Sequence, residues 1–172
     1  MEYVVLVDEE DNEVGQMEKL QAHLEGRLHR AISVFIFNAR GELLLQQRAA
    51  GKYHSGSLWT NTCCSHPRPG ELVLDAANRR LFEEMGLACE LKEVFSFVYR
   101  AELDNGITEH ELDHVFIGVS DIIPVPDPEE VRLWRYMAVG ALEKDIAAHP
   151  ASYTEWFKIC IKDWKAQLFT AV

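Results

Sequence analysis

The chain has 172 residues, of which 48% are hydrophobic and 26% are charged. This length and composition suit a single globular domain over residues 1–172 and exclude a disordered chain. Because 28 acidic residues outnumber 17 basic ones, the formal net charge is −11, and we expect no surface for nucleic acid or an anionic membrane. An anionic ligand would need a local group of basic side chains or a bound metal ion.

The cysteines and the N-terminal sequence lead us to expect a cytoplasmic protein. No stretch approaches the roughly 20 apolar residues that span a bilayer. The first residues, 1–3, lack the basic and apolar segments of a signal peptide. Two of the four cysteines are adjacent, which suits a mutual disulfide poorly, so reduced thiols are expected at Cys63, Cys64, Cys89 and Cys160.

Strand-like and turn-like segments alternate in the N-terminal half. A short apolar run at 4–7 is followed by β-branched and aromatic residues at 32–37, which predict a strand. Residues 42–47 predict its returning partner in a hairpin, across a turn at 38–41. Segments without regular structure are expected at 8–15, 49–56 and 59–70.

The C-terminal half predicts further strands and three helices. Apolar residues at helical spacing predict a helix at 75–85, with Gly86 as its C-terminal stop. The segment 89–103 is predicted to contain a long strand, FSFVYRAEL at 95–103, which a turn at 104–106 joins to a strand at 107–119, and a later strand is predicted at 131–137. Two closing helices are predicted at 139–149 and 153–169. The expected fold is a mixed β-sheet flanked by helices, of the α/β or α+β class.

Five side chains from separate parts of the chain could hold a metal ion. Glu109 and Glu111 stand two apart on a predicted strand, so their carboxylates share one face while His110 points to the other. Adjacent carboxylates repel unless a cation holds them. Imidazoles that could complete a site for Zn, Mn or Fe belong to His23, His29 and His66. The alternative is a solvated acidic strand end with unrelated surface histidines.

Cys64 lies two residues before His66, and three roles are compatible with this position. The side chain could be a small buried hydrophobe, a zinc ligand together with His66, or a thiol that acts as base or nucleophile. Cys63 has no obvious chemical neighbour, and we expect it to be structural.

Glu84 follows Arg80 by four residues on the predicted helix, a spacing that allows an ion pair on one helix face. Either this pair belongs to an ordinary salt-bridged helix face, or Glu84 faces a magnesium ion that carries phosphates. The basic side chains nearest to these clusters are Lys19, Arg48, Lys52 and Arg80.

The stretch from Ser65 to Leu87 resembles the Nudix box. It has the pattern S-x5-E-x7-R-R-L-x-E-E-x-G-L, where the box has G-x5-E-x7-R-E-U-x-E-E-x-G-U. Ser65 replaces the first glycine, and Arg80 replaces the glutamate after the arginine. That glutamate normally gathers magnesium for attack on a diphosphate, so its replacement argues against ordinary Nudix hydrolysis.

Most of the chain, from Glu18 to Trp156, is similar to the type I isopentenyl diphosphate isomerases of the Nudix superfamily. The resemblance is carried by LWTNTCCSHPRPGE, with HLEGRLH before it and ITEHELDHVF after it. It implies interconversion of isopentenyl and dimethylallyl diphosphate in isoprenoid biosynthesis, by protonation and deprotonation through a tertiary carbocation. The loop at 53–56 lacks the proline that some members carry before its glycine.

The resemblance also implies a role for each matching residue. A Mn²⁺ or Zn²⁺ ion is expected on His23, His29, His66, Glu109 and Glu111. The implied catalytic residues are Cys64, Glu111 and the assisting Tyr99. Glu84 matches the ligand of a second ion, Mg²⁺, that is bound with the substrate diphosphate. The residues that match substrate-binding positions are Lys19, Arg48, Lys52, Arg80 and Trp156.

The implied reaction needs these residue types. An unactivated alkene requires a desolvated proton donor on one face and a base on the other, roles that we assign to Glu111 and Cys64 in the forward direction. The ring of Trp156 can stabilise the carbocation. Two alternatives are a Nudix pyrophosphohydrolase and a non-catalytic zinc-stabilised domain. The expected partner is a small diphosphate, and the expected assembly is a monomer or weak homodimer.

Overall fold

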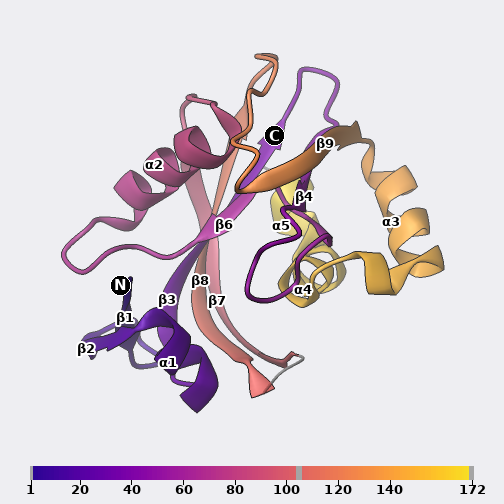
Figure 1. Ribbon diagram of the computed structural model, residues 1–172. Coiled ribbons are helices and arrows are strands. Elements are labelled where there is room, and N and C mark those ends of the chain that lie inside the picture. Colours follow the sequence, from indigo (N-terminus) through magenta and orange to yellow (C-terminus); the bar gives the residue numbers. More distant parts are fainter. Residues whose placement is uncertain (1, 104–105, 171–172) are drawn as a thin grey trace.

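The computed structural model describes residues 2–103 and 106–170, in which the strands form one mixed sheet with helices on both sides (Figure 1). The strands are β1 (Tyr3–Val7), β2 (Glu13–Glu18), β3 (His29–Phe37), β4 (Leu43–Arg48), β5 (Trp59–Thr60), β6 (Cys63–Ser65), β7 (Lys92–Glu102), β8 (Thr108–Val119) and β9 (Val131–Met137). The helices are α1 (Lys19–Glu25), α2 (Val73–Met85), α3 (Val139–Ala148), α4 (Glu155–Asp163), α5 (Lys165–Thr170) and the short 3-10 helix η2 (Pro150–Ser152).

β3 is the central strand of the sheet. It runs parallel to β8 from the pair His29 and Glu111 to the pair Phe37 and Val119. It is antiparallel to β6, where Ser33 lies opposite Cys64. β8 also pairs with β7, while β4 pairs with β5 and β9. Because β8 and β6 both join β3, residues distant in sequence meet at one end of the sheet.

β3 is buried on both faces, which explains its nearly continuous apolar sequence. On one face, Ile32, Val34 and Ile36 form a core with residues of α2 such as Leu81. On the other face, Phe35 and Phe37 form a second core with α4 and α5, including Phe157, Cys160 and Leu168. Figure 1 shows α2 and the pair α4 and α5 on opposite sides of these strands.

The predicted hairpin at 32–47 is correct only at its turn. β3 and β4 share the single pair Phe37 and Leu43, and the strands then separate. Thr62 fills the gap, since its hydroxyl accepts from the backbone N–H of Ile36 at 2.9 Å and donates to the carbonyl of Leu44 at 2.6 Å. A side-chain hydroxyl therefore replaces the ladder hydrogen bonds that a hairpin would form.

α2 confirms the helix that the apolar spacing predicts, although it begins two residues earlier, at Val73. It ends at Gly86, whose backbone has a left-handed φ of 63°. A Cβ atom at Gly86 would lie 2.6 Å from the carbonyl oxygen of Val125, so any other residue would clash as well as strain the turn. The glycine thus fixes the direction in which the chain leaves α2.

Four predicted boundaries are wrong. The segment expected as one helix at 153–169 is divided into α4 and α5 at Trp164, whose ring stacks on Phe95 with centroids 4.8 Å apart. The segment expected to be irregular at 59–70 contains β5 and β6, and the turn expected at 8–15 gives way to β2 from Glu13. The strand expected at 95–103 begins earlier, at Lys92, and ends at Glu102. Asp104 and Asn105 of the predicted turn lie outside the described residues.

Candidate active site

A cavity of about 670 Å³ opens where β3, β6 and β8 meet the loop after β4. Its volume is in the range of pockets for small organic ligands. The predicted site residues that line it are Lys19, Arg48, Lys52, Cys64, His66, Arg80, Glu84, Glu109, Glu111 and Trp156. Three further predicted residues, His23, His29 and Tyr99, lie buried in the protein and are linked to Glu111 by the contacts described below.

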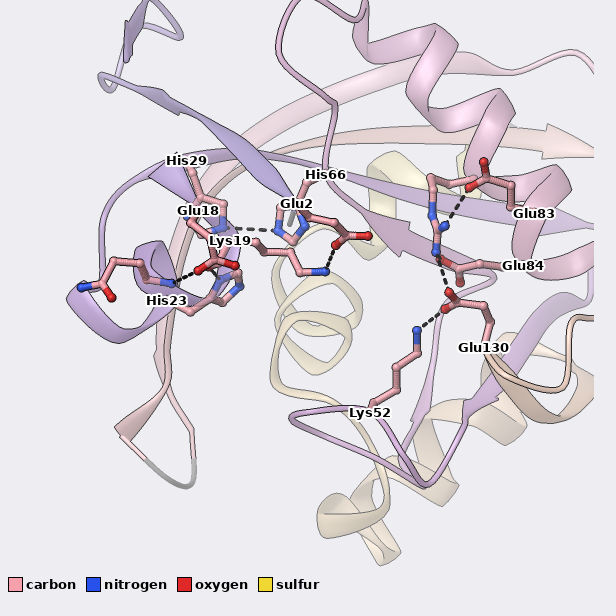
Figure 2. A network of polar contacts seen from close by, with 12 residues as sticks. Glu2, Glu18, Lys19, His23, His29, Lys52, His66, Glu83, Glu84 and Glu130 are labelled. Atoms are coloured by element: carbon pink, nitrogen blue, oxygen red, sulfur yellow. Dashed lines mark hydrogen bonds and ion pairs between the residues drawn. The ribbon is translucent and has the colours of Figure 1, made fainter. Parts of the chain in front are cut away.

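Four of the five predicted metal ligands converge on one point. His23 comes from α1, His29 begins β3, His66 follows β6, and Glu111 lies beside His29 on β8. Figure 2 shows the three imidazoles facing one another. Their Nε2 atoms lie 4.0, 3.4 and 2.8 Å from Glu111 Oε1, for His23, His29 and His66 respectively. One donor atom from each residue lies within 4.8 Å of all the others.

The surroundings of these four residues fit a divalent cation. The Nδ1 atoms of His23 and His29 hydrogen-bond to the backbone carbonyls of Lys19 and Arg27, at 2.7 and 2.8 Å. Since a carbonyl only accepts, each Nδ1 carries the proton and each Nε2 presents a lone pair. His23 Nε2 is fully buried without a hydrogen-bond partner. Neighbouring ligands held about 2.1 Å from one ion lie about 3.0–3.4 Å apart, which is close to the spacings seen.

The fifth predicted ligand, Glu109, lies beside this group rather than within it. Its Oε1 atom is 3.5 Å from His54 Nε2, and Glu109, His54 and His23 form a second group of donor atoms within 4.8 Å of one another. His54, whose side chain is 7% exposed, is a residue of this site that the sequence analysis missed. Its position depends on the folding of the loop after β4, and no spacing in the sequence signals it.

Tyr99 joins the two carboxylates. It lies directly across from Glu111 in the β7–β8 pair, and its hydroxyl lies 2.5 Å from Glu111 Oε2 and 2.8 Å from Glu109 Oε2. Burial, and then the charge of Glu111, raise the pKa of Glu109 well above its usual value. Burial opposes ionisation of Glu111 too, but its close contacts with the imidazoles of His29 and His66 hold its pKa well below the usual value. Without an ion, the proton of the pair therefore rests on Glu109.

Cys64 lies on β6 and borders the cavity. Its sulfur accepts a weak hydrogen bond from Arg48 Nη1 at 3.9 Å. Burial raises the pKa of the Cys64 thiol more than Arg48 lowers it, so the thiol keeps its proton near neutral pH. The neighbouring Cys63 points to the opposite face, into the core beneath α2, in agreement with its expected structural position.

Every basic residue assigned to the diphosphate, apart from Arg48, contacts a carboxylate. Lys19 is paired with Glu2, and Lys52 with Glu130 (Figure 2). Arg80 reaches Glu84 at 2.7 Å, Glu83 at 2.7 Å and Glu130 at 3.3 Å. The contact of Arg80 with Glu84 is the ion pair that their spacing in the sequence allows.

Arg48 and Glu84 are each held by neighbouring residues around the cavity. The guanidinium of Arg48 lies 5.4 Å from the ring centre of Trp156, and its Nη2 donates to the carbonyl of His54 at 3.3 Å. Glu84 Oε2 accepts from Gln46 Nε2 at 2.8 Å. The cavity therefore has an acidic, histidine-rich end, a thiol and an indole on its walls, and a group of basic side chains opposite.

Comparison with known proteins defines the class of this fold. The NUDIX domain family model matches residues 27–157. A crystal structure from Deinococcus radiodurans is similar with a TM-score of 0.78 and 21% identity, covering 94% of this chain and 98% of that one. A MutT NUDIX hydrolase from Burkholderia pseudomallei has a TM-score of 0.62 and 18% identity, over 78% and 96% of the two chains. The expected sheet and flanking helices are thus those of a Nudix fold.

Sequence relatives narrow this class. An isopentenyl-diphosphate Delta-isomerase of Pectobacterium atrosepticum is 55% identical over 156 residues, which cover 91% of this chain and 87% of that protein. The enzyme of the same name from Burkholderia multivorans is 51% identical over 161 residues, covering 94% and 92%. This protein belongs to the isopentenyl-diphosphate Delta-isomerase family of the Nudix superfamily, which confirms the resemblance. Within the described residues, no helix is both long and apolar enough to cross a membrane.

Proposed function

We infer that this protein is an enzyme that interconverts isopentenyl and dimethylallyl diphosphate, a step of isoprenoid biosynthesis. The observation that best supports this function is that Cys64 and Glu111 line one cavity, with Tyr99 hydrogen-bonded to Glu111. The relatives that share about half of its residues carry the name of this isomerase. The reaction moves one proton onto the terminal alkene carbon and removes another from C2.

Cys64 and Glu111 are the proposed acid and base. They lie on β6 and β8, which flank β3 from two sides, so a substrate between them meets one group on each face. Burial keeps the proton on the Cys64 sulfur, and the resting pair is therefore thiol and carboxylate. For the forward direction, as we assign it, Glu111 must first gain a proton and Cys64 must first lose one. The Tyr99 hydroxyl passes its proton to Glu111 while it takes one from protonated Glu109, and the Cys64 thiol releases its proton to solvent in the open cavity. Donation by Glu111 and acceptance of the C2 proton by Cys64 then restore the resting thiol and carboxylate. The roles reverse in the opposite direction.

Trp156 is the proposed wall of the hydrocarbon pocket. Its side chain is almost wholly buried, and its Nε1 donates to Asn61 Oδ1 at 3.3 Å, which fixes the ring. An aromatic face beside a tertiary carbocation stabilises it by about 0.5–2 kcal/mol. The same ring excludes water, which would otherwise trap the cation as an alcohol.

The basic group opposite binds the diphosphate in this proposal. Arg48, Lys52 and Arg80, together with Lys19 from α1, would reverse the negative sign of the protein locally, and Glu84 would hold a Mg²⁺ ion that arrives with the substrate. A Mn²⁺ or Zn²⁺ ion held by His23, His29, His66, Glu109 and Glu111 would supply the positive charge that keeps the two carboxylates together. We further propose that the enzyme works in the cytoplasm as a monomer or weak homodimer.

The family relationship does not favour Nudix hydrolysis. At the position where the Nudix box has a magnesium-binding glutamate, Arg80 contacts Glu83 and Glu84. A guanidinium has no lone pair to offer a metal ion, so Arg80 cannot replace that glutamate as a ligand. A water nucleophile on magnesium therefore lacks a ligand that hydrolysis requires.

Proton NMR in D₂O tests the proposal, with isopentenyl diphosphate, Mg²⁺ and Mn²⁺ present. Wild type should form deuterated dimethylallyl diphosphate, whereas Cys64→Ala should form none. Cys89→Ala is the matched control, because Cys89 is remote from the cavity lining, and it should retain activity. Release of phosphate, or unchanged substrate with wild type, would overturn the isomerase assignment.

A further inference from the structure

His54 lies in a strained loop that turns its imidazole into the protein. The loop connects β4 to β5, and Ser55 and Ser57 adopt left-handed backbone conformations with φ of 51° and 65°. Non-glycine residues adopt this conformation at a cost and cluster where a ligand or active site requires it. The side chain of His54 is only 7% exposed. The Arg48 guanidinium holds the loop from inside, through the carbonyl of His54.

The ring of His54 stands among the metal-site residues. Its centre is 5.8 Å from that of His23, close to the 5.5 Å between His23 and His66. Its Nε2 atom is 3.5 Å from Glu109 Oε1, which is a common separation for two ligands of one ion but long for a hydrogen bond. Its Nδ1 faces the hydroxyl of Ser55 at 3.2 Å, which can donate to it or accept from it.

Two groups of donor atoms share one residue. His23 belongs both to the group with His29, His66 and Glu111 and to the group with His54 and Glu109. Its Nε2 is buried and unpartnered, at the junction of the two. Together the groups supply six side chains, the number of ligands that Mn²⁺ accepts in an octahedral site.

We propose that His54 is a sixth protein ligand of the metal centre, completing the set formed by three other imidazoles and two glutamates. The Nε2 atom of His54 faces Glu109 and the shared His23, which is the side from which a neutral imidazole would coordinate the ion. Six protein ligands leave no position for water on the ion, as in closed structural sites. If the proposed function holds, the absence of water on the ion also keeps water away from the carbocation.

The experiment measures Mn²⁺ bound to the full chain and needs no turnover. Histidine is labelled with ¹⁵N, pulsed EPR counts the coordinated imidazoles, and water-proton relaxation reports water on the ion. Wild type should show four imidazoles and low relaxivity. His54→Ala should show three imidazoles, higher relaxivity as water enters, and an affinity for Mn²⁺ weaker by about tenfold or more.

Two variants control for folding and for nonspecific loss of a histidine. His54→Gln keeps a polar side chain of similar size and should also lose one coordinated imidazole. His149→Ala removes an exposed histidine and should match wild type. Three imidazoles in wild type, or equal relaxivity and affinity in wild type and His54→Ala, would overturn this inference alone. Failure of wild type to bind Mn²⁺ would overturn it together with the proposed metal centre, whereas absent isomerase activity with four imidazoles would overturn only the proposed function.

Discussion

Tyr99 and Glu111 face each other across the β7–β8 pair, and the tyrosine hydroxyl lies 2.5 Å from the glutamate Oε2. The same hydroxyl lies 2.8 Å from Glu109, although it has a single proton to donate. Both carboxyl groups are buried. They are stabilised by the hydroxyl proton of Tyr99, by a proton on Glu109 and by the imidazoles on the other side of Glu111. Tyr99 is therefore the group best placed to move a proton to or from Glu111.

Tyr99→Phe removes this hydroxyl and keeps the ring. We expect kcat of isomerisation to fall by about 10²-fold, the lower range for loss of a general acid–base contribution, while the variant stays folded. The measurement is the initial rate at saturating substrate, with circular dichroism as the check on folding. Tyr136→Phe is the control, because Tyr136 lies outside the cavity lining. An unchanged kcat in Tyr99→Phe would contradict a proton-transfer role.

Under the proposed function, Glu130 would compete with a bound diphosphate for the side chains of Lys52 and Arg80. It contacts Lys52 and Arg80, and interaction with them lowers its pKa despite partial burial. Glu130→Gln leaves both basic groups free of this negative charge. We expect inorganic diphosphate to bind about threefold to tenfold more tightly, corresponding to roughly 1 kcal/mol.

Isothermal titration with inorganic diphosphate measures this affinity. Glu129→Gln is the matched control, since it removes the same charge from an exposed neighbour that lies outside the cavity lining. Weaker binding to Glu130→Gln than to wild type would show that Glu130 orients the cations instead of competing for them.

The sequence analysis succeeds where local periodicity decides the structure. Alternation along a strand predicts that Glu109 and Glu111 share a face, and His110 indeed points away, to the carbonyl of Gly26. Helical spacing and a glycine stop likewise predict most of α2. In these segments the chain's own geometry determines which side chains meet.

Other parts of the site depend on contacts between distant segments. His54 reaches Glu109 only through the loop after β4, and Glu130 reaches Lys52 across 78 positions of sequence. α1 is seven residues long, too short to show periodicity, yet it brings His23 to the site. The break at Trp164 follows from stacking on β7, which helix propensity cannot reveal.

Metal binding should stabilise the fold. Three imidazoles and Glu111 face a common point, and His23 Nε2 has no protein partner there. After a chelator has removed any bound metal, free Mn²⁺ or Zn²⁺ is added back. At a hundred times Kd, the ion should raise the free energy of unfolding by about 2.7 kcal/mol. For a chain of this size, thermal unfolding should shift upward by about 5–10 °C. His23→Ala should lose most of the shift and His149→Ala none, while an equal shift in all three proteins would point to nonspecific binding.

Glu71 and Arg79 should make the stability of the chain depend on pH. Arg79 Nε and Nη2 donate to the two carboxylate oxygens of Glu71, at 2.7 and 2.8 Å, and these hydrogen bonds lower the pKa of Glu71. Because the pKa of Glu71 is lower in the folded chain, the pair adds stability at pH values above about 4.3, the pKa of glutamate in the unfolded chain. This added stability is lost as the pH falls through the pKa of the folded chain. Glu71→Gln should therefore cost about 0.5–1 kcal/mol at pH 7, since the pair is partly exposed.

Urea unfolding of wild type and Glu71→Gln across pH checks this expectation. The two free energies of unfolding should converge as pH falls below about 4, where protonation removes the carboxylate that the variant lacks. Glu90→Gln, at an exposed position, should follow wild type throughout. A difference that persisted at low pH would mean that Glu71 stabilises α2 through packing or its backbone contact to Arg68, instead of through its charge.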